Sequence, residues 1–198
     1  MSLSELPATA AWDHSGSRRG FEVAAFARTD GGWIVTGATT AVEADVPWWV
    51  TYEIELTSSF VTRRAAIAGR TGPGTVSAVR IEGDGLGRWT VDDRAEPGLD
   101  GCLDLDLESS AMTNTLPLRR LDPRPTATVW APAVYVRAQG LAVERLEQSY
   151  ARREDGARSG PSVDYEAPAF DFACRIDYDS SGLVVDYPGI ARRVQLAR

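Results

Sequence analysis

Alternating acidic residues form the densest group of chemically active side chains in the sequence. Asp104, Asp106 and Glu108 alternate with three leucines, which is the period of a β-strand with one apolar face. Two carboxylates at this spacing lie roughly 6.6–7 Å apart. That distance suits an inverting glycosidase, which needs roughly 6.5–9.5 Å, and the same oxygens could hold Ca²⁺. A solvated strand face explains the pattern without any chemistry, so we assign neither catalytic residues nor a metal site.

A second polar group follows at Asn114, Arg119 and Arg120. An amide and a guanidinium can hold a sugar hydroxyl or a phosphate group, whereas the alternative is a turn that satisfies its own backbone. Adjacent arginines on a strand point to opposite faces, so at most one of them can face a pocket. We also expect an ion pair between Asp104 or Asp106 and Arg119 or Arg120. In this prediction the segments before and after the polar turn 109–115 are neighbouring strands.

Aromatic residues complete the set of candidates. Five aromatic residues could line an apolar cavity or stack on a sugar ring, although such residues are commonly part of a core: Trp48, Trp49, Trp89, Trp130 and Tyr135. Tyr150 is a further candidate for ligand binding. The single histidine, His14, lies near the N-terminus, where a Ser-His-Asp triad is not expected. The glycines at 83, 85 and 87 lack the following helix of a phosphate-binding loop, and we expect no cofactor.

Short alternating segments separated by Gly, Pro and Asp turns position these residues. The segment 141–152 fits both a helix and a strand, and we favour a strand because its neighbours are β-rich. No segment of residues 20–107 shows sustained helical periodicity. The pattern predicts an all-β, mainly antiparallel fold of many short strands with little helix. The expected strands cover 21–28, 33–42, 47–57, 61–69, 75–82, 88–92, 102–108, 128–139, 141–152, 170–178 and 183–187.

Length and composition favour one domain over residues 1–198, with 1–19 as an irregular lead-in. The 198 residues are 43% hydrophobic and 25% charged, and the net charge is −7. That charge argues against nucleic acid or an anionic bilayer as the main partner. We find neither a membrane span nor a signal peptide, so we expect a cytoplasmic protein. Cys102 and Cys174 are expected to be reduced thiols, although a disulfide stays open.

Several motifs carry a resemblance to a known family. They are GLDGCLDLDL at 98–107, TNTLPLRRL at 113–121, and shorter pieces at 87–89, 146–150 and 182–189. With them the chain resembles a family of bacterial proteins labelled "putative glycolipid-binding", formerly a domain of unknown function, from about residue 21 onward. The resemblance implies an antiparallel β-roll or open barrel, similar to periplasmic lipoprotein carriers that hold acyl chains. The family provides no catalytic residues, and residues 109–112 depart from its usual aromatic and proline.

We therefore expect a non-catalytic binding protein for an amphipathic small molecule, such as a glycolipid or a fatty acid. One alternative is an enzyme that acts on a sugar or phosphate substrate through Asp104, Asp106 and Arg119. Another is a protein-interaction module whose open sheet edge takes up a partner strand. The oligomeric state stays open. The expected ligand-binding residues are Asp104, Asp106, Asn114, Arg119, Arg120, Trp48, Trp89 and Tyr150.

Overall fold

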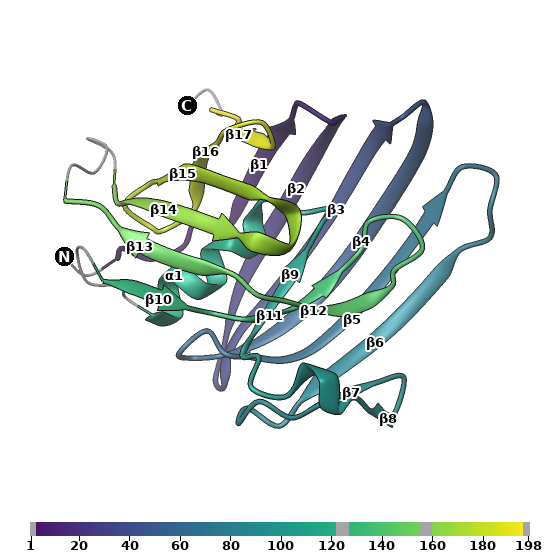
Figure 1. Ribbon diagram of the computed structural model, residues 1–198, viewed down its shortest axis with the longest axis horizontal. Helices are drawn as coiled ribbons and strands as arrows, with labels where there is room; N and C mark the ends of the chain where they lie inside the picture. Colours follow the sequence, from purple (N-terminus) through teal and green to yellow (C-terminus); the bar gives the residue numbers. More distant parts are fainter. Residues whose placement is uncertain (1–2, 122–126, 155–159, 196–198) are drawn as a thin grey trace.

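A computed structural model describes residues 3–121, 127–154 and 160–195, which form one large and one small β-sheet (Figure 1). The first eight strands are β1 (Thr9–His14), β2 (Arg18–Thr29), β3 (Gly32–Glu43), β4 (Val46–Thr57), β5 (Thr62–Thr71), β6 (Ser77–Gly83), β7 (Trp89–Val91) and β8 (Arg94–Ala95). They form a continuous antiparallel meander. The predicted strands between residues 21 and 92 are confirmed. The lead-in prediction is wrong for residues 9–14, because β1 pairs with β2.

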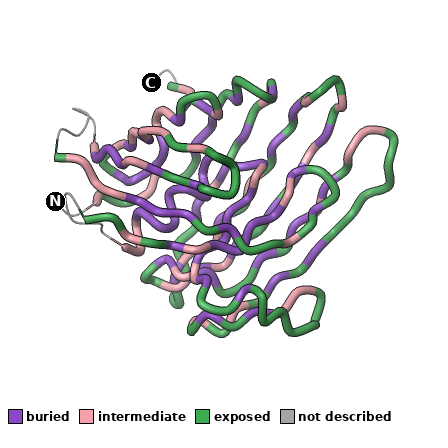
Figure 2. The backbone as a smooth tube through the Cα atoms, in the orientation of Figure 1, coloured by how far each residue is buried: buried purple, intermediate pink, exposed green. Residues whose placement is uncertain are grey.

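Tight turns explain how the longest strands keep their register. Ala44 and Asp45 connect β3 to β4, and both have positive φ angles, of 48° and 62°. Two successive residues with positive φ form the type I′ turn, whose twist matches that of the flanking strands. Asp92 and Asp93, with φ angles of 47° and 64°, join β7 to β8 in the same way. Buried and exposed residues alternate along the long strands, as Figure 2 shows.

The C-terminal strands extend the large sheet on the other side of β1. They are β10 (Thr128–Trp130), β13 (Ser149–Arg152), β14 (Ser162–Ala167), β15 (Phe172–Tyr178), β16 (Val184–Tyr187) and β17 (Ala191–Arg193). The turn between β14 and β15 holds a short 3-10 helix, η3 (Pro168–Phe170). The sheet order is β10-β13-β14-β15-β16-β17-β1-β2-β3-β4-β5-β6-β7-β8. In the part of the chain that is described, β10 and β8 are both edge strands, so the sheet is an open one, as the resemblance implies.

The small sheet consists of β9 (Asp104–Leu107), β11 (Ala133–Val136) and β12 (Val143–Leu146), in the order β12-β11-β9. Its β9–β11 pair is parallel, in contrast to the antiparallel pairs elsewhere. The predicted strand 128–139 therefore splits into β10 and β11, which belong to different sheets. Pro132 lies at the break, where a residue without a backbone N–H cannot continue a central ladder. The predicted strand 141–152 likewise splits into β12 and β13.

Short helices occupy the chain around β9. They are η1 (Pro97–Leu99), η2 (Met112–Asn114) and α1 (Thr115–Leu121). The segments before and after residues 109–115 are thus a strand, β9, and a helix, α1. Our expectation that they are neighbouring strands is wrong. The proline at position 117 is tolerated because the first helical turn makes no use of its missing N–H.

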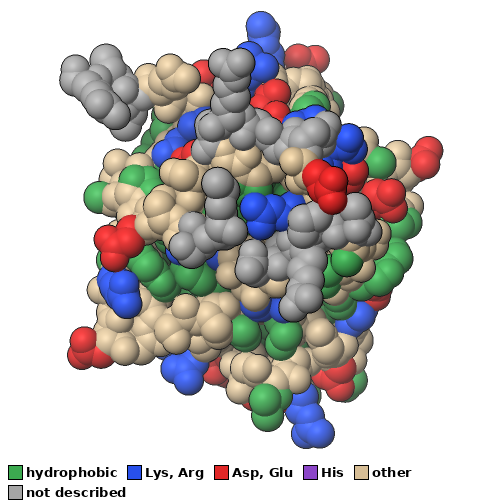
Figure 3. All heavy atoms as spheres, turned by 90° about the vertical axis from the view of Figure 1, so that its left-hand side faces the viewer, with side chains coloured by type: hydrophobic (Ala, Val, Ile, Leu, Met, Phe, Trp, Pro, Cys, Tyr) green, Lys and Arg blue, Asp and Glu red, His purple; other side chains and the backbone are tan. Residues whose placement is uncertain are grey.

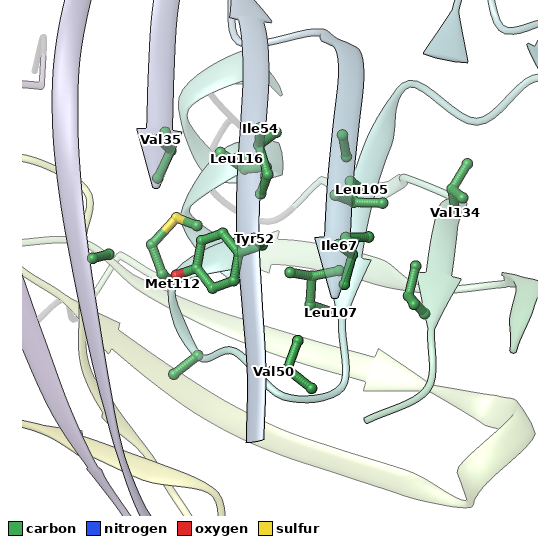
Figure 4. Close-up of a cluster of buried hydrophobic side chains, with 14 of the residues drawn as sticks. Val35, Val50, Tyr52, Ile54, Ile67, Leu105, Leu107, Met112, Leu116 and Val134 are labelled. Atoms are coloured by element: carbon green, nitrogen blue, oxygen red, sulfur yellow. The ribbon is translucent and has the colours of Figure 1, made fainter. Parts of the chain in front are cut away.

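The small sheet is covered on both faces. Leu105 and Leu107 of β9 and Val134 of β11 pack against β4 and β5 in one apolar cluster (Figure 4). On the opposite face, Tyr135 and Leu146 join a second cluster with β13–β16. All four residues of β9 are consequently buried. The large sheet thus curls around the small one, and each face of the small sheet faces its own apolar cluster.

The exposed sides and the cysteines complete the picture. The face near β10 and β13 mixes acidic, basic and apolar side chains (Figure 3). Among the described helices, none has the length and apolar character needed to cross a membrane. Cys102 and Cys174 are both free thiols, which confirms that expectation.

Candidate functional site

A pocket of about 220 Å³ opens between the small sheet and strands β14–β16. We call it the Asp106 pocket. The turn that holds η3 contributes Phe170 to the lining, and the centroid of the Phe170 ring lies 5.4 Å from that of the Tyr135 ring of β11. The lining residues are Arg18, Asp106, Leu107, Glu108, Ser110, Asn114, Tyr135, Arg137, Leu146, Tyr165, Ala167, Phe170, Phe172, Tyr187 and Ile190.

The first acidic residue of the strand, Asp104, is fully buried and tied to helix α1. Arg120 donates two hydrogen bonds to it, from Nε to Oδ1 at 2.9 Å and from Nη2 to Oδ2 at 2.6 Å. Burial raises the pKa of the Asp104 carboxyl, and Arg120 opposes that rise. The expected ion pair between an aspartate and an arginine is confirmed for this pair, although its arginine comes from a helix. Asp104 does not line the pocket.

The last acidic residue, Glu108, is held by two arginines and a backbone amide. Its Oε2 accepts a hydrogen bond from the Ala138 amide at 2.8 Å. Its Oε1 lies 3.8 Å from Arg18 Nη2 and 3.7 Å from Arg137 Nη1. Arg18 also donates to the Glu108 carbonyl. Glu108 is therefore a compensated charge at the rim of the pocket.

The middle residue, Asp106, has the least support of the three acids. It is only 6% exposed, and its Oδ1 accepts a hydrogen bond from Thr113 Oγ1 at 2.9 Å. Within the described residues, its other oxygen has no hydrogen-bond partner and no arginine forms an ion pair with it. Burial raises the pKa of Asp106 to about 6, and the charges of Asp104 and Glu108 add to the rise.

The prediction that the acidic residues form a solvated strand face is therefore wrong. Leucines and acids alternate as predicted, but the face that carries the acids lies against the second apolar cluster rather than against water. Among the described residues, no three His, Cys, Asp or Glu side chains converge in a way that could hold a metal ion. The calcium alternative has no site there.

Asn114 brings an amide to the same pocket. Its Oδ1 accepts a hydrogen bond from the buried Tyr150 hydroxyl at 3.0 Å, which fixes the orientation of the side chain. The Asn114 Nδ2 group has no protein acceptor among the described residues, so its two N–H groups are left for a ligand. Tyr150 does not line the pocket, and its part is to orient Asn114.

Aromatic rings form the wall opposite the small sheet. Tyr165, Phe172 and Tyr187 contact one another, with ring centroids 5.9 to 6.2 Å apart. Burial raises the pKa of the Tyr165 and Tyr187 hydroxyls, and the charge of Asp106 raises both further. These phenols are therefore neutral hydrogen-bonding groups near the carboxylate.

The remaining predicted residues lie elsewhere. Arg119 donates to the carbonyls of Ser181 and Ser4, and its guanidinium lies 4.4 Å from the centre of the Phe60 ring. It lines a different pocket, next to the N-terminal segment. The structure therefore does not bring Asp104, Asp106 and Arg119 to one cavity.

Both predicted tryptophans are core residues. Trp48 is buried under Arg18, whose guanidinium lies 5.6 Å from the ring centre. Trp89 donates its indole N–H to the Cys102 carbonyl at 2.9 Å. Of the eight predicted ligand-binding residues, only Asp106 and Asn114 line the Asp106 pocket.

The sequence reasoning missed most of the aromatic wall. Phe172 and Tyr187 occupy alternating positions of predicted strands, which was the available signal. Tyr165 lies in β14, a segment for which we predicted no strand. Arg18 gave no signal at all, because its contact with Glu108 joins residues 90 positions apart.

A buried carboxylate on β2 supports the turn beside the pocket. Glu22 accepts hydrogen bonds from Tyr52 Oη at 2.8 Å, from the Ala111 amide at 2.8 Å and from Ser110 Oγ. His14 Nε2 lies 3.4 Å from its Oε2. Gly37 makes space for this arrangement, because a Cβ there would lie 2.3 Å from the Tyr52 ring. The large sheet thereby fixes the position of the 109–111 turn.

Comparisons with known proteins match nearly the whole chain. The profile of a family described as "Putative glycolipid-binding" matches residues 9–193. A DUF1089 family protein from Pseudomonas aeruginosa is 27% identical, with a TM-score of 0.76, and the match covers 98% of this chain and 97% of that one. A beta-barrel-like protein of domain of unknown function DUF1849 from Brucella abortus is 9% identical, with a TM-score of 0.57 and 98% of each chain covered. This second likeness shows the fold alone. No curated protein matches.

Proposed function

This chain belongs to the family described as "Putative glycolipid-binding", and we propose that its Asp106 pocket holds the sugar head group of an amphipathic ligand. One observation carries the proposal. The second carboxylate oxygen of Asp106 and the amide nitrogen of Asn114 belong to residues that line the pocket, and neither atom has a hydrogen-bond partner among the described residues. Neither atom is fully enclosed by protein, so a ligand that enters the pocket can form hydrogen bonds with both.

The chemistry of the pair fits a sugar. A hydroxyl group can donate to the free Asp106 oxygen, and a neighbouring hydroxyl can accept from Asn114 Nδ2. The rings of Tyr165, Phe172 and Tyr187 provide the apolar surface on which the C–H face of a sugar ring can pack. A few convergent polar groups in a mainly aromatic pocket are typical of small-molecule sites.

The size of the pocket limits what enters it. Its volume of about 220 Å³ lies below the roughly 300–1,000 Å³ of pockets for drug-sized ligands. One sugar ring fits that space better than a complete lipid does. The apolar chain of the ligand would then lie at the mouth, beside Phe170, which is 40% exposed.

Binding of octyl glucoside below its micelle concentration tests the proposal. We expect saturable binding by titration calorimetry, with a loss of at least tenfold in Asn114→Ala. The control is Asp13→Asn, which changes an exposed polar residue of β1 that does not line the pocket. Equal binding by wild type and Asn114→Ala, or no binding of any glycoside, would refute the assignment of this pocket.

Native mass spectrometry of protein purified from its own cells provides an independent test. A co-purifying glycolipid that is absent from Asn114→Ala supports the proposal. Lipid-free protein that cleaves glycosides would instead favour the enzyme alternative, and a stoichiometric protein partner would favour the interaction module.

A further inference from the structure

Arginines near the Asp106 pocket are already matched by carboxylates. Arg120 pairs with Asp104, and Arg18 lies against Glu108. Arg137 contacts Glu108 and also pairs with Glu144, with 2.6 Å between Nε and Oε1. Three arginines thus face three carboxylates, and Asp106 is the fourth acid, for which the described residues provide no cation.

The missing charge matters because Asp106 is buried. An ionised carboxylate is costly to bury unless it is paired or well hydrogen-bonded, and Asp106 has one hydrogen bond, from Thr113. The charged groups around it are Asp104 and Glu108 on either side, Arg120 on α1, Arg18 on β2 and Arg137 after β11. The two nearest acids raise its pKa.

Three tyrosines line the pocket together with Asp106, namely Tyr135 of β11, Tyr165 of β14 and Tyr187 of β16. In each of them burial and the charge of Asp106 raise the pKa of the hydroxyl. A phenol is either neutral or anionic, so these tyrosines cannot supply the cation. Their rings attract positive charge through the π-system.

We propose that the ligand supplies the missing cation, so that the head group carries an ammonium group, as an amino sugar does, which binds between Asp106 and the tyrosine rings. This inference rests on the proposed function and specifies the chemical class of its ligand. A carboxylate together with aromatic rings is a recurring way to recognise an ammonium group. An anionic head group would face an uncompensated carboxylate, and a neutral sugar would leave that carboxylate without its countercharge.

The proposal predicts a pH-dependent affinity, because protons and the ammonium group compete for the Asp106 carboxylate. Asp106, with its pKa near 6, is mainly ionised at pH 7 and mainly protonated at pH 5. An ammonium group binds the ionised form, so its affinity should fall about tenfold between pH 7 and pH 5, while a neutral glycoside should not respond in this way. By linkage, the bound amine lowers the pKa of Asp106, and its binding near pH 6 releases protons.

The test compares methyl glucosaminide with methyl glucoside and methyl N-acetylglucosaminide on the intact wild-type chain. These probes keep the sugar ring and differ in whether the C2 substituent is charged. We expect the amine to bind at least tenfold more tightly than either neutral probe at pH 7, and this preference to disappear at pH 5 and in Asp106→Asn. Calorimetry at pH 6 in two buffers of different ionisation enthalpy should show proton release for the amine alone.

Each outcome decides between the two proposals. Equal affinities for the three probes overturn the amine inference and leave the head-group pocket standing. A preference that persists in Asp106→Asn also overturns it. If no probe and no octyl glucoside binds, both proposals fail. If Asp106→Asn does not fold, the carboxyl carbon of Asp106 in the wild type is followed by NMR, and an unchanged pKa in saturating amine refutes the inference.

Discussion

Removing Arg120 should destabilise the protein far more than removing an exposed arginine. The side chains of Asp104 and Arg120 are 0% and 13% exposed, so Arg120→Met leaves a buried carboxylate without its cation. Breaking a buried ion pair in this way costs roughly 3–5 kcal/mol. Because total stabilities are about 5–15 kcal/mol, urea unfolding at pH 7 should show a large fall in the midpoint.

Removing both partners should cost much less than removing Arg120 alone. Burial raises the pKa of Asp104 in spite of Arg120, so the attraction within the pair does not fully offset the desolvation of the carboxylate. Replacing a buried pair by apolar residues of similar size is often neutral or stabilising. We therefore expect Asp104→Leu/Arg120→Met to be close to wild type, with a coupling energy of at least about 1.5 kcal/mol.

The pH dependence of Arg120→Met provides a second readout. Without its arginine, the pKa of Asp104 rises further above its value in the unfolded chain. An acid whose pKa is raised by folding binds more protons in the folded state, so stability increases as the pH falls. Arg120→Met should consequently regain stability on acidification, whereas Asp104→Leu/Arg120→Met should not.

An exposed pair across β4 and β5 gives the matched control. Arg64 and Glu55 have side chains that are 48% and 34% exposed, and such pairs contribute at most about 1 kcal/mol. Arg64→Met should therefore cost at most about 1 kcal/mol. If Asp104→Leu and Arg120→Met are simply additive, or if Arg120→Met costs no more than Arg64→Met, the reasoning about the buried pair is refuted.

Three further predictions follow from buried groups. The pKa of Asp106 rises from 3.8 to about 6, which corresponds to about 3 kcal/mol at 1.36 kcal/mol per pKa unit, so Asp106→Asn should stabilise the protein by up to about 3 kcal/mol at pH 7. Since this penalty disappears as Asp106 protonates between pH 6 and 4, urea unfolding should show no gain at pH 4, and a gain that is independent of pH would contradict the assignment. Glu22→Leu should lower stability by roughly 3 kcal/mol or more, because it leaves buried donors unsatisfied, and an unchanged thermal midpoint would contradict this. Burial raises the pKa of the Cys102 thiol to about 11 and that of Cys174 to about 12, so both should resist alkylation at pH 8 until the protein is denatured, as mass spectrometry of the labelled protein can show.

The part of the large sheet from β2 to β7 could be predicted well because its signals are local. Trp48 to Leu56 alternate with polar residues, and the turns at Asp30 and Gly72 are recognisable from composition. Each strand of the N-terminal meander pairs with its sequence neighbour, so local pattern and final topology agree. β1 was missed because its residues, Thr9–His14, include three that are buried in succession, which hides the alternation.

The small sheet could not be predicted because its burial depends on distant strands. The alternation in 103–108 identifies a strand. An alternating strand with one buried face is expected to bury its leucines and to expose its acids to solvent. That inference fails when a second layer covers the other face, here supplied by β13–β16. No sequence pattern within residues 99–121 indicates that β14, some 60 positions later, covers this face. The ion pair was predictable from charge, whereas helix α1, which carries its arginine, was not.

This two-sided burial also explains how one strand gives three acids different properties. On a solvated face, water would screen the charges of Asp104, Asp106 and Glu108 alike. Between two apolar clusters, each acid depends on the cations that the fold provides, and only the outer two receive arginines. The middle acid keeps an oxygen directed at a pocket, at a cost in stability that Asp106→Asn is predicted to remove. A single substitution that stabilises the protein and abolishes its preference for an amine would show that the same uncompensated charge causes both effects.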